Sequence, residues 1–431
     1  MKSRQENRKN RRSRRPMANY KNESYKKKTI LPTGGYAVVM IIMLLVALAF
    51  MVMLTVVNAF PVSITMSLLG AMAVLLIAAG FLFKRKSKWL RAFGVIVAVF
   101  FVGLYGLGTY YLANTFAAFA RISEAQESVS EGSGALTERS FNIYITGIDQ
   151  WESEKGKDLE RSDVNMIATV CPQTRKILLT SIPRDTYVRL HTAQQMDKLT
   201  HTGIYGVEET LGTVEDWLGV PMDYYVKMNF TAVVDIINAI DGVDVYSPKE
   251  FVPVKRDWWT VKKGWNHMNG KQALAFARER KAFGSEDSKR VENQQRVVDA
   301  ILKKLMTSPA ILTNYPEILK AASDNMSTNM TSGEMQELVK MQLADMGEWE
   351  IDKQKVEGVY DMDYVASLTQ EQQFLVYKAD DASVEGVKAK IDSVMNPSEA
   401  EIEAIEEAKK KETAMKLFNR LFRRDKDSKE K

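Results

Sequence analysis

The chain is poor in the residues that make disulfides and zinc sites. It has one cysteine, Cys171, and three histidines among 431 residues. One cysteine cannot form an internal disulfide, and Cys171 lies in an alternating apolar run typical of a buried free thiol. Since zinc sites need several cysteine or histidine ligands, His191 and His201 are expected to be structural or surface residues.

Charged residues are missing from long stretches near the N-terminus. No Asp, Glu, Lys or Arg occurs from Tyr36 to Phe83, and a further uncharged run extends from Ala92 to Ala120. Runs of this length can cross the hydrocarbon core of a bilayer as helices. The expected membrane spans are residues 36–57, 62–83 and 92–115.

Basic residues flank these spans unevenly. Residues 1–28 hold twelve Lys or Arg against two Glu, and residues 84–91 (KRKSKWLR) carry five basic residues. Under the positive-inside rule the tail of residues 1–35 and this loop are cytoplasmic, so the chain after about residue 120 is outside the cell. The tail has no helix-turn-helix or other base-reading element, which favours attraction to anionic lipid over DNA binding.

The region after the spans is expected to hold one layered α/β domain, residues 140–395, behind a small polar linker at residues 121–139. Alternation and β-branched residues predict strands, and strands that alternate with helices favour a layered arrangement. Strands are predicted at 141–149, 164–172, 176–185, 223–230 and 243–247. Helices are predicted at 203–218, 231–240 and 288–306. Residues 251–270 are expected to form a hairpin or ordered loop, and residues 396–431 a charged helix and tail.

Four arginine-bearing motifs stand out in this domain. They are R-S-D (161–163), I-P-R-D (182–185), R-E-R (278–280) and R-V-E-N-Q (290–294). The planar guanidinium of arginine suits bidentate contact with phosphate oxygens. A phosphate-binding site outside the membrane points to lipid-linked phosphate chemistry.

The spacing within each motif can bring its side chains together. Residues two apart on a strand share a face, as do residues four apart on a helix. Arg161 and Asp163 are expected at a strand entry, Arg278 and Arg280 on an extended AFARER segment, and Arg290 and Gln294 on a helix. Arg184 follows a proline at a strand end, where a loop residue can face a cleft.

Two aspartates are candidate metal ligands. Asp149 is expected to end one strand and Asp163 to begin the next, so their carboxylates can meet at one end of the sheet. Mg²⁺ prefers oxygen ligands, and the pair beside bound phosphate predicts a site for Mg²⁺ or Mn²⁺. By itself, R-E-R is usually a salt-bridged surface and an isolated Asp a turn former; the combination of four motifs is what is specific.

This combination resembles the LytR-CpsA-Psr family of bacterial cell-envelope proteins, and in particular its CpsA-like branch. The likeness covers roughly residues 140–306, and the three spans with a basic tail fit the same branch. Where the family often has Gly-Ser-Asp, this chain has Gly147–Ile148–Asp149. Residues 312–395 carry no recognisable motif. The matching segments are FNIYITGID, RSDVNMIATV, TRKILLTSIPRDTYV, DKLTHTGIYG, LGVPMDYYVKMNF, INAIDGVDV, NGKQALAFARERK and RVENQQRVVDAI.

The resemblance implies an extracytoplasmic α/β/α domain with a central, mostly mixed sheet. It also implies a transferase that moves the sugar phosphate of a polyprenyl-pyrophosphate-linked glycopolymer, such as capsular polysaccharide, to a peptidoglycan hydroxyl and releases polyprenyl phosphate. The polyprenyl tail would enter an apolar tunnel between sheet and helices. Membrane lipid and the machinery that synthesises the polymer are further candidate partners, and no nucleic acid is expected.

The resemblance also assigns roles to residues. Catalysis would involve Arg184, Arg278, Arg280 and Asp163. The pyrophosphate would be bound by Arg161, Arg184, Lys198, Arg278, Arg280, Arg290 and Gln294. Asp149 and Asp163 would hold Mg²⁺.

Two other functions use the same features. A hydrolase would cleave polyprenyl pyrophosphate with water as the acceptor, and the same arginines would serve it. A membrane-bound regulator of polymer synthesis or transcription would contact DNA or a partner through the basic tail.

Overall fold

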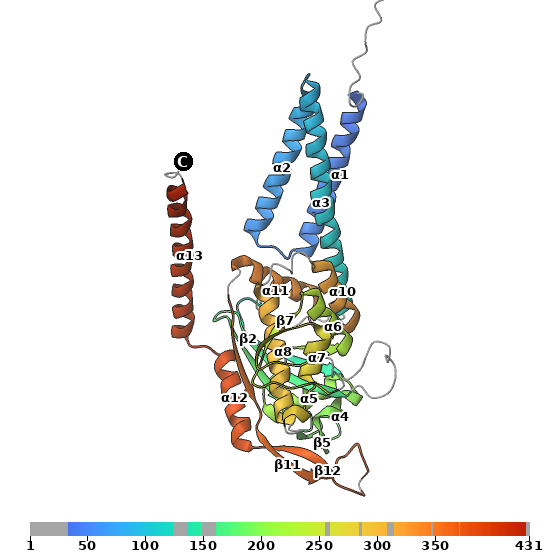
Figure 1. Ribbon diagram of the computed structural model, residues 1–431, viewed down its shortest axis with the longest axis vertical. Helices are drawn as coiled ribbons and strands as arrows, with labels where there is room; N and C mark the ends of the chain where they lie inside the picture. The colour runs from blue at the N-terminus through green and yellow to red at the C-terminus, as the bar shows by residue number, and fades with distance from the viewer. Residues whose placement is uncertain are drawn as a thin grey trace, which may run out of the picture.

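The computed structural model describes residues 33–123, 136–148, 161–254, 259–283, 287–307, 314–345, 348–369 and 371–427. Three long helices come first: α1 (Thr33–Val57), α2 (Val62–Lys84) and α3 (Lys88–Ile122). By length and composition each can cross a membrane, as the uncharged runs predict. The three helices form a bundle that rises from one end of the sheet domain (Figure 1).

A six-stranded sheet forms the centre of the domain, in the order β10–β3–β2–β1–β6–β9. Neighbours β1–β2, β2–β3 and β6–β9 are antiparallel, whereas β1–β6 and β3–β10 are parallel, so the sheet is mixed as expected. The strands predicted from alternation are all present. The bounds are β1 Phe141–Ile148, β2 Ser162–Cys171, β3 Lys176–Ile182, β6 Tyr224–Asn229, β9 Met326–Thr328 and β10 Glu350–Lys355.

Helices cover both faces of the sheet and give an α/β/α arrangement (Figure 1). On one face Tyr144, Ile167 and Leu178 are fully or almost fully buried against α5 (Val207–Leu218) and α12 (Asp381–Met395). The other face is covered by α6 (Phe230–Ala239), α7 (Gly270–Ala277) and α8 (Asp287–Thr307). Because side chains alternate along a strand, each strand supplies both layers. Cys171 is a buried free thiol, as predicted.

Smaller elements surround this core. The predicted strand at residues 243–247 is β7 (Val243–Ser247), which pairs with β8 (Gly264–Met268) in a separate hairpin. The pairs β4 (Tyr187–Arg189) with β5 (Met196–Lys198) and β11 (Gly358–Asp363) with β12 (Phe374–Ala379) were not predicted. The helix predicted at 203–218 is divided: α4 (Leu199–Thr202) and a 3₁₀ turn (Gly203–Tyr205) precede α5, because Gly206 has a φ of 108°.

The last membrane helix is packed directly against the domain. Ala118 and Phe119 of α3 contact Leu319 of α10 (Tyr315–Asn325) and Met335 of α11 (Ser332–Asp345). Ser123, which follows α3, forms a bridge with Thr328 of β9. The predicted linker therefore begins as helix, and residues 124–135 of it lie outside the described residues. The charged C-terminal helix is α13 (Glu399–Asp427).

Candidate active site

A cavity of about 700 Å³ lies between the sheet and the helices α6, α7 and α8. The strands contribute mostly apolar residues to it, and every second residue of a strand faces the cavity, for example Ile143 and Ile145 of β1. Residues of α8 close the opposite side, among them Val298, Ile301 and Leu305. The predicted apolar tunnel between sheet and helices is therefore present in the structure.

One end of the cavity is strongly basic. Four arginines and Gln294 line this end. Among the described residues of the lining, one side chain is acidic, that of Asp163. Arg290 and Gln294 lie on the same face of α8, as their spacing predicts, and Arg290 is only 4 % exposed. Positive charge held in a partly buried wall attracts anions more strongly than the same charge in water. The four arginines are Arg184, Arg278, Arg280 and Arg290.

The polarity of the cavity changes along α8. Arg290 and Leu305 are about 22 Å apart along the helix, from the rise of 1.5 Å per residue. The apolar end faces the membrane bundle: Leu302 of α8 and Met335 of α11 pack against one apolar cluster, and Met335 also packs against Ala118 and Phe119 of α3. A ligand with an anionic head and a long apolar tail matches this division.

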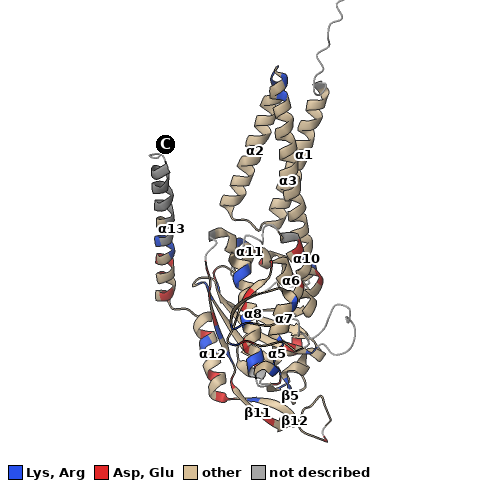
Figure 2. Ribbon diagram, viewed as in Figure 1, with Lys and Arg blue, Asp and Glu red and all other residues tan. Residues whose placement is uncertain are grey.

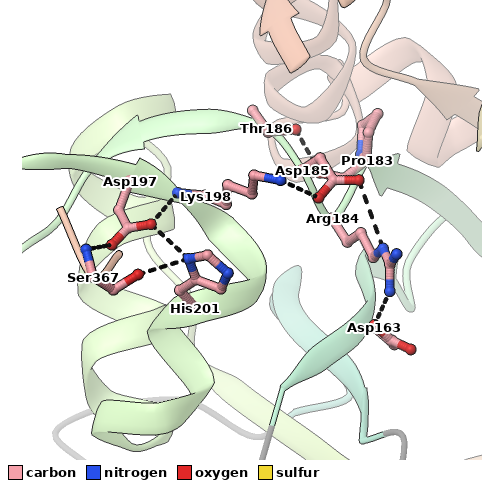
Figure 3. A network of polar contacts seen from close by, with 9 residues as sticks. All are labelled: Asp163, Pro183, Arg184, Asp185, Thr186, Asp197, Lys198, His201 and Ser367. Atoms are coloured by element: carbon pink, nitrogen blue, oxygen red, sulfur yellow. Dashed lines mark hydrogen bonds and ion pairs between the residues drawn. The ribbon is translucent and has the colours of Figure 1, made fainter. Parts of the chain in front are cut away.

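Arg184 belongs to a chain of ion pairs (Figure 3). Its Nη1 lies 2.5 Å from Oδ1 of Asp163, and its Nε lies 3.7 Å from Oδ2 of Asp185. Lys198 Nζ is 3.3 Å from Oδ1 of the same Asp185. The backbone fixes this loop as well, because Thr200 donates its N–H to the Arg184 carbonyl at 2.8 Å. Arg184 thus faces the cavity as predicted. Lys198 does not line the cavity and is connected to Arg184 through Asp185.

A buried cluster supports Lys198 and was missed by sequence reasoning. Asp197 accepts hydrogen bonds from the Lys198 amide (2.6 Å), the Ser367 amide (2.9 Å) and His201 Nδ1 (2.7 Å) (Figure 3). Burial would raise the pKa of Asp197, but these bonds outweigh it and hold the pKa below its usual value. His201 is 5 % exposed and structural, as expected. Asp197 and His201 are only four residues apart, which the sequence shows directly, although Asp197 lies on β5 and His201 on α4. Ser367 lies in a region without motifs.

The prediction that AFARER is extended is wrong. The helix α7 continues to Ala277, and Arg278 is its C-cap residue with φ −94° and ψ −6°. The helix begins firmly because Asn269 and Gln272 form a reciprocal capping box. Both arginines still line the cavity, from the end of a helix and the turn after it.

Glu279, between these arginines, has a structural role. It is 3 % exposed and accepts backbone N–H groups of Val254 at 2.9 Å and Ala282 at 3.0 Å. The guanidinium of Arg278 lies 4.3 Å from the ring centre of Phe230, which adds a cation–π contact. R-E-R is therefore not an ordinary solvated ion-pair surface: its glutamate braces the loop while its arginines face the cavity.

The wall made by α6 and α7 depends on a glycine. A Cβ added at Gly270 would lie 2.1 Å from the carbonyl oxygen of Val234, so only glycine allows the two helices to approach this closely. On the other side of the cavity, α8 is fastened to β10 through Glu292, whose carboxylate is 3.2 Å from Lys355. Burial would raise the pKa of Glu292, but Lys289 and Lys355 hold it below its usual value.

Three predicted site residues are not found in the described lining of the cavity, and one of them is Lys198, which contacts Asp185. Arg161 precedes β2, is exposed, and is not among the residues that line the cavity. Asp149 lies outside the described residues.

Two side-chain hydrogen bonds hold the end of β1 against β2 beside Asp163. The Tyr144 hydroxyl donates to Asn165 Oδ1 at 2.6 Å, and the hydroxyl oxygens of Thr146 and Ser162 are 2.7 Å apart.

The model of the LytR-CpsA-Psr family matches residues 108–392, well over half of the chain. This protein belongs to the LytR-CpsA-Psr family. The match confirms the resemblance carried by the motifs, and it extends through residues 312–392, where no motif was recognised.

Several curated relatives in this family are similar to the chain. One is the polyisoprenyl-teichoic acid–peptidoglycan teichoic acid transferase TagU of Bacillus licheniformis, 29 % identical over 73 % of this chain and 98 % of that protein. TagU of Bacillus anthracis is 33 % identical over 55 % of this chain and 77 % of that protein.

Solved structures show the same fold. Bacillus subtilis TagV has a TM-score of 0.50 and 28 % identity, over 60 % of this chain and 98 % of TagV. A structure described as TagT bound to LIIa-WTA has a TM-score of 0.50 and 25 % identity, over 64 % of this chain and 98 % of TagT.

The residues at the basic end of the cavity bear on whether this LytR-CpsA-Psr protein can hold Mg²⁺. The described residues contain no cluster of three or more His, Cys, Asp or Glu side chains suited to a metal. Mg²⁺ is, however, commonly held by one or two carboxylates, with substrate phosphate and water as the remaining ligands. Asp163 lines the cavity and meets Arg184 through Oδ1, so its carboxylate together with bound phosphate fits the ion.

Proposed function

We propose that this protein is a membrane-anchored phosphotransferase that attaches a polyprenyl-pyrophosphate-linked glycopolymer to peptidoglycan and releases polyprenyl phosphate. The polymer is an anionic glycopolymer of the cell envelope, a teichoic acid or a capsular polysaccharide. One observation carries the proposal: a single cavity is basic at one end and apolar along the rest, with its apolar end beside the membrane bundle. Relatives named as teichoic acid transferases support the same reaction class.

The proposed site is outside the cell. The basic turn between α2 and α3 lies at the end of the bundle far from the sheet domain (Figure 2). Because basic loops remain in the cytoplasm, this arrangement supports a position of the sheet domain on the outer side. There the site has access to peptidoglycan and to lipid-linked polymer.

The proposed reaction needs little covalent chemistry from the protein. The acceptor hydroxyl oxygen forms a bond to the phosphorus that carries the sugar, and the bond from this phosphorus to the bridging oxygen breaks. Polyprenyl phosphate leaves, and the hydroxyl proton passes to solvent or a nearby base. Arg184, Arg278 and Arg280 stabilise charge on the phosphate oxygens, which is the main task in phosphoryl transfer.

Other residues hold the reactants in place. Arg290 and Gln294 contact the phosphate next to the lipid, since they lie where α8 changes from polar to apolar. Lys198, held by Asp185 and Asp197, positions Arg184 from behind. Asp163 would hold Mg²⁺, which adds positive charge at the phosphate oxygens when bound.

The test is a transfer assay with the purified full chain, a lipid-linked polymer donor and peptidoglycan. We expect polymer to become covalently attached to peptidoglycan and polyprenyl phosphate to be released only when peptidoglycan is present. Release at the same rate without peptidoglycan, with no attached polymer, would make the protein a hydrolase. No release at all, with altered transcription on deletion of residues 1–28, would favour the regulator.

A further inference from the structure

The membrane bundle contains a second cavity, of about 710 Å³, between the start of α1 and the end of α2. These helix ends lie at the end of the bundle away from the sheet domain (Figure 1). Its walls are the first turns of α1, with Tyr36 and Met40, and the last turns of α2, with Ile77 and Phe81. Lys84 and Arg91 stand at its rim. An apolar space with two cations at one end is complementary to a lipid with a hydrocarbon chain and an anionic headgroup.

The cations of this region have no carboxylate within the anchor. From Tyr25 to Ser123 the sequence contains no Asp or Glu, although Lys84, Arg85, Lys86, Lys88 and Arg91 all lie there. Figure 2 shows this basic turn at one end of α2 and α3, and the only other charged residue of the three helices is Arg121, in the last turn of α3. Their counter-charge therefore comes from outside the anchor, and the phosphate groups of lipids are the anions at this depth.

Of these five cations, Lys84 and Arg91 line the cavity, and the position of Arg91 is fixed by its neighbours. Arg91 Nε donates to the Arg85 carbonyl at 2.6 Å, which holds the guanidinium beside the ring of Tyr36, 5.7 Å from its centre. Tyr36 packs in turn on Phe83, with ring centres 5.0 Å apart. Arg91 is thus held in place at the rim by its neighbours, whereas Lys86 does not line the cavity.

A glycine keeps the space open. Gly80 of α2 lines the cavity, and a Cβ added there would meet only Met40 Cε within 4 Å, at an ordinary contact distance of 3.7 Å. A larger side chain at this position would project into the cavity without disturbing the helix backbone. Gly80 therefore offers a way to fill the cavity while leaving its charge unchanged.

We propose that this cavity binds a phosphate-bearing membrane lipid, with the phosphate between Lys84 and Arg91 and the hydrocarbon chain between α1 and α2. The ligand chemistry is shared by polyprenyl phosphate, a phosphomonoester, and by phosphatidylglycerol, a phosphodiester. This site lies at the opposite end of the bundle from the arginine cavity and does not depend on the transferase reaction.

The experiment measures binding of each of these two lipids to the detergent-solubilised full chain by native mass spectrometry. The double variant Lys84→Gln/Arg91→Gln is expected to bind at least about tenfold more weakly, since it loses two charge-assisted contacts. Gly80→Leu is expected to lower binding by steric filling. The matched controls are Lys86→Gln, with one charge fewer in the same turn, and Gly70→Leu on α2, where an added Cβ meets nothing within 4 Å.

The variants do not change the arginine-lined cavity between the sheet and α6, α7 and α8. Lipid bound in that cavity is therefore a constant background in every measurement. Loss in the double variant and in Gly80→Leu, with both controls at the wild-type value, supports the site. The lipid that binds more tightly, polyprenyl phosphate or phosphatidylglycerol, is then the ligand of the site. Wild-type binding in the double variant and in Gly80→Leu, or an equal loss in Lys86→Gln, overturns the proposal in favour of general attraction to a basic surface.

Discussion

Arg184 and Asp163, which come from two different sequence motifs, form an ion pair of 2.5 Å at the basic end of the cavity. The side chains are 24 % and 14 % exposed, so the pair is largely shielded from water. The contact joins the end of β3 to the start of β2. It makes the carboxylate and the guanidinium parts of a single unit that faces the cavity.

This pairing predicts a metal-dependent loss on substitution of the carboxylate. Asp163→Asn is expected to lower turnover roughly 100-fold, because one preorganised electrostatic contact is typically worth this much. Turnover is measured against Mg²⁺ concentration with and without chelator. Asp299→Asn on α8, outside the cavity lining, is the control. Activity that is indifferent to chelator would remove Mg²⁺ and Asp163 from the proposed mechanism.

The arginines of the R-E-R motif should be separable from Arg161. Arg278→Ala and Arg280→Ala are each expected to lower turnover by about 100- to 1,000-fold, since each removes a cation from the cavity where we propose that the phosphates bind. Arg161→Ala is expected to change it less than about tenfold, because Arg161 is exposed and outside the lining. Thermal unfolding of each variant checks the fold. Equal losses at Arg161 and Arg280 contradict this ranking.

The apolar part of the cavity predicts chain-length dependence. Val298→Trp puts a larger side chain into the space, so KM for a long-chain polyprenyl donor is expected to rise about tenfold. A short-chain donor should be affected little. Lys303→Trp places the same side chain on the exposed side of α8 and is the control. A similar rise of KM for both donors would mean that the tail binds elsewhere.

The Asp197 cluster predicts a dependence of stability on pH. The folded pKa of Asp197 lies below its unfolded value, so the unfolded state binds more protons as the pH falls. The stabilisation is present above about pH 4 and is lost as the pH falls through the folded pKa. Melting temperatures of the wild type and Asp197→Asn should therefore converge on acidification from pH 7. A gap that stays constant down to pH 3 argues against an ionised Asp197.

Sequence patterns anticipated the strongly periodic parts of the molecule. The β-branched alternation of β1, β2, β3 and β6 predicted their positions closely, because one face of each strand contacts a helix layer and the other lines the cavity. The spacing of Arg290 and Gln294 on α8 was equally informative. These patterns arise from burial, which constrains residue type directly.

Other elements have no such pattern. The edge strand β10 reads Glu-Ile-Asp-Lys-Gln-Lys, is largely polar and is held by pairing with β3, so its sequence does not alternate. The helical end at Arg278 was misread because two arginines separated by one residue look like a strand face. The contact of Ser367 with Asp197 joins positions 170 residues apart, which a single sequence cannot reveal.

The lipid that accompanies the protein on purification tests the proposed role of the arginine-lined cavity most directly. Detergent-extracted wild-type protein should carry a polyprenyl pyrophosphate or its polymer-linked form, identified by mass spectrometry. Arg280→Ala protein, prepared in the same way, should carry much less of it. Absence of any pyrophosphate lipid from the wild type, or equal amounts in both proteins, would contradict the assignment of the arginine cavity.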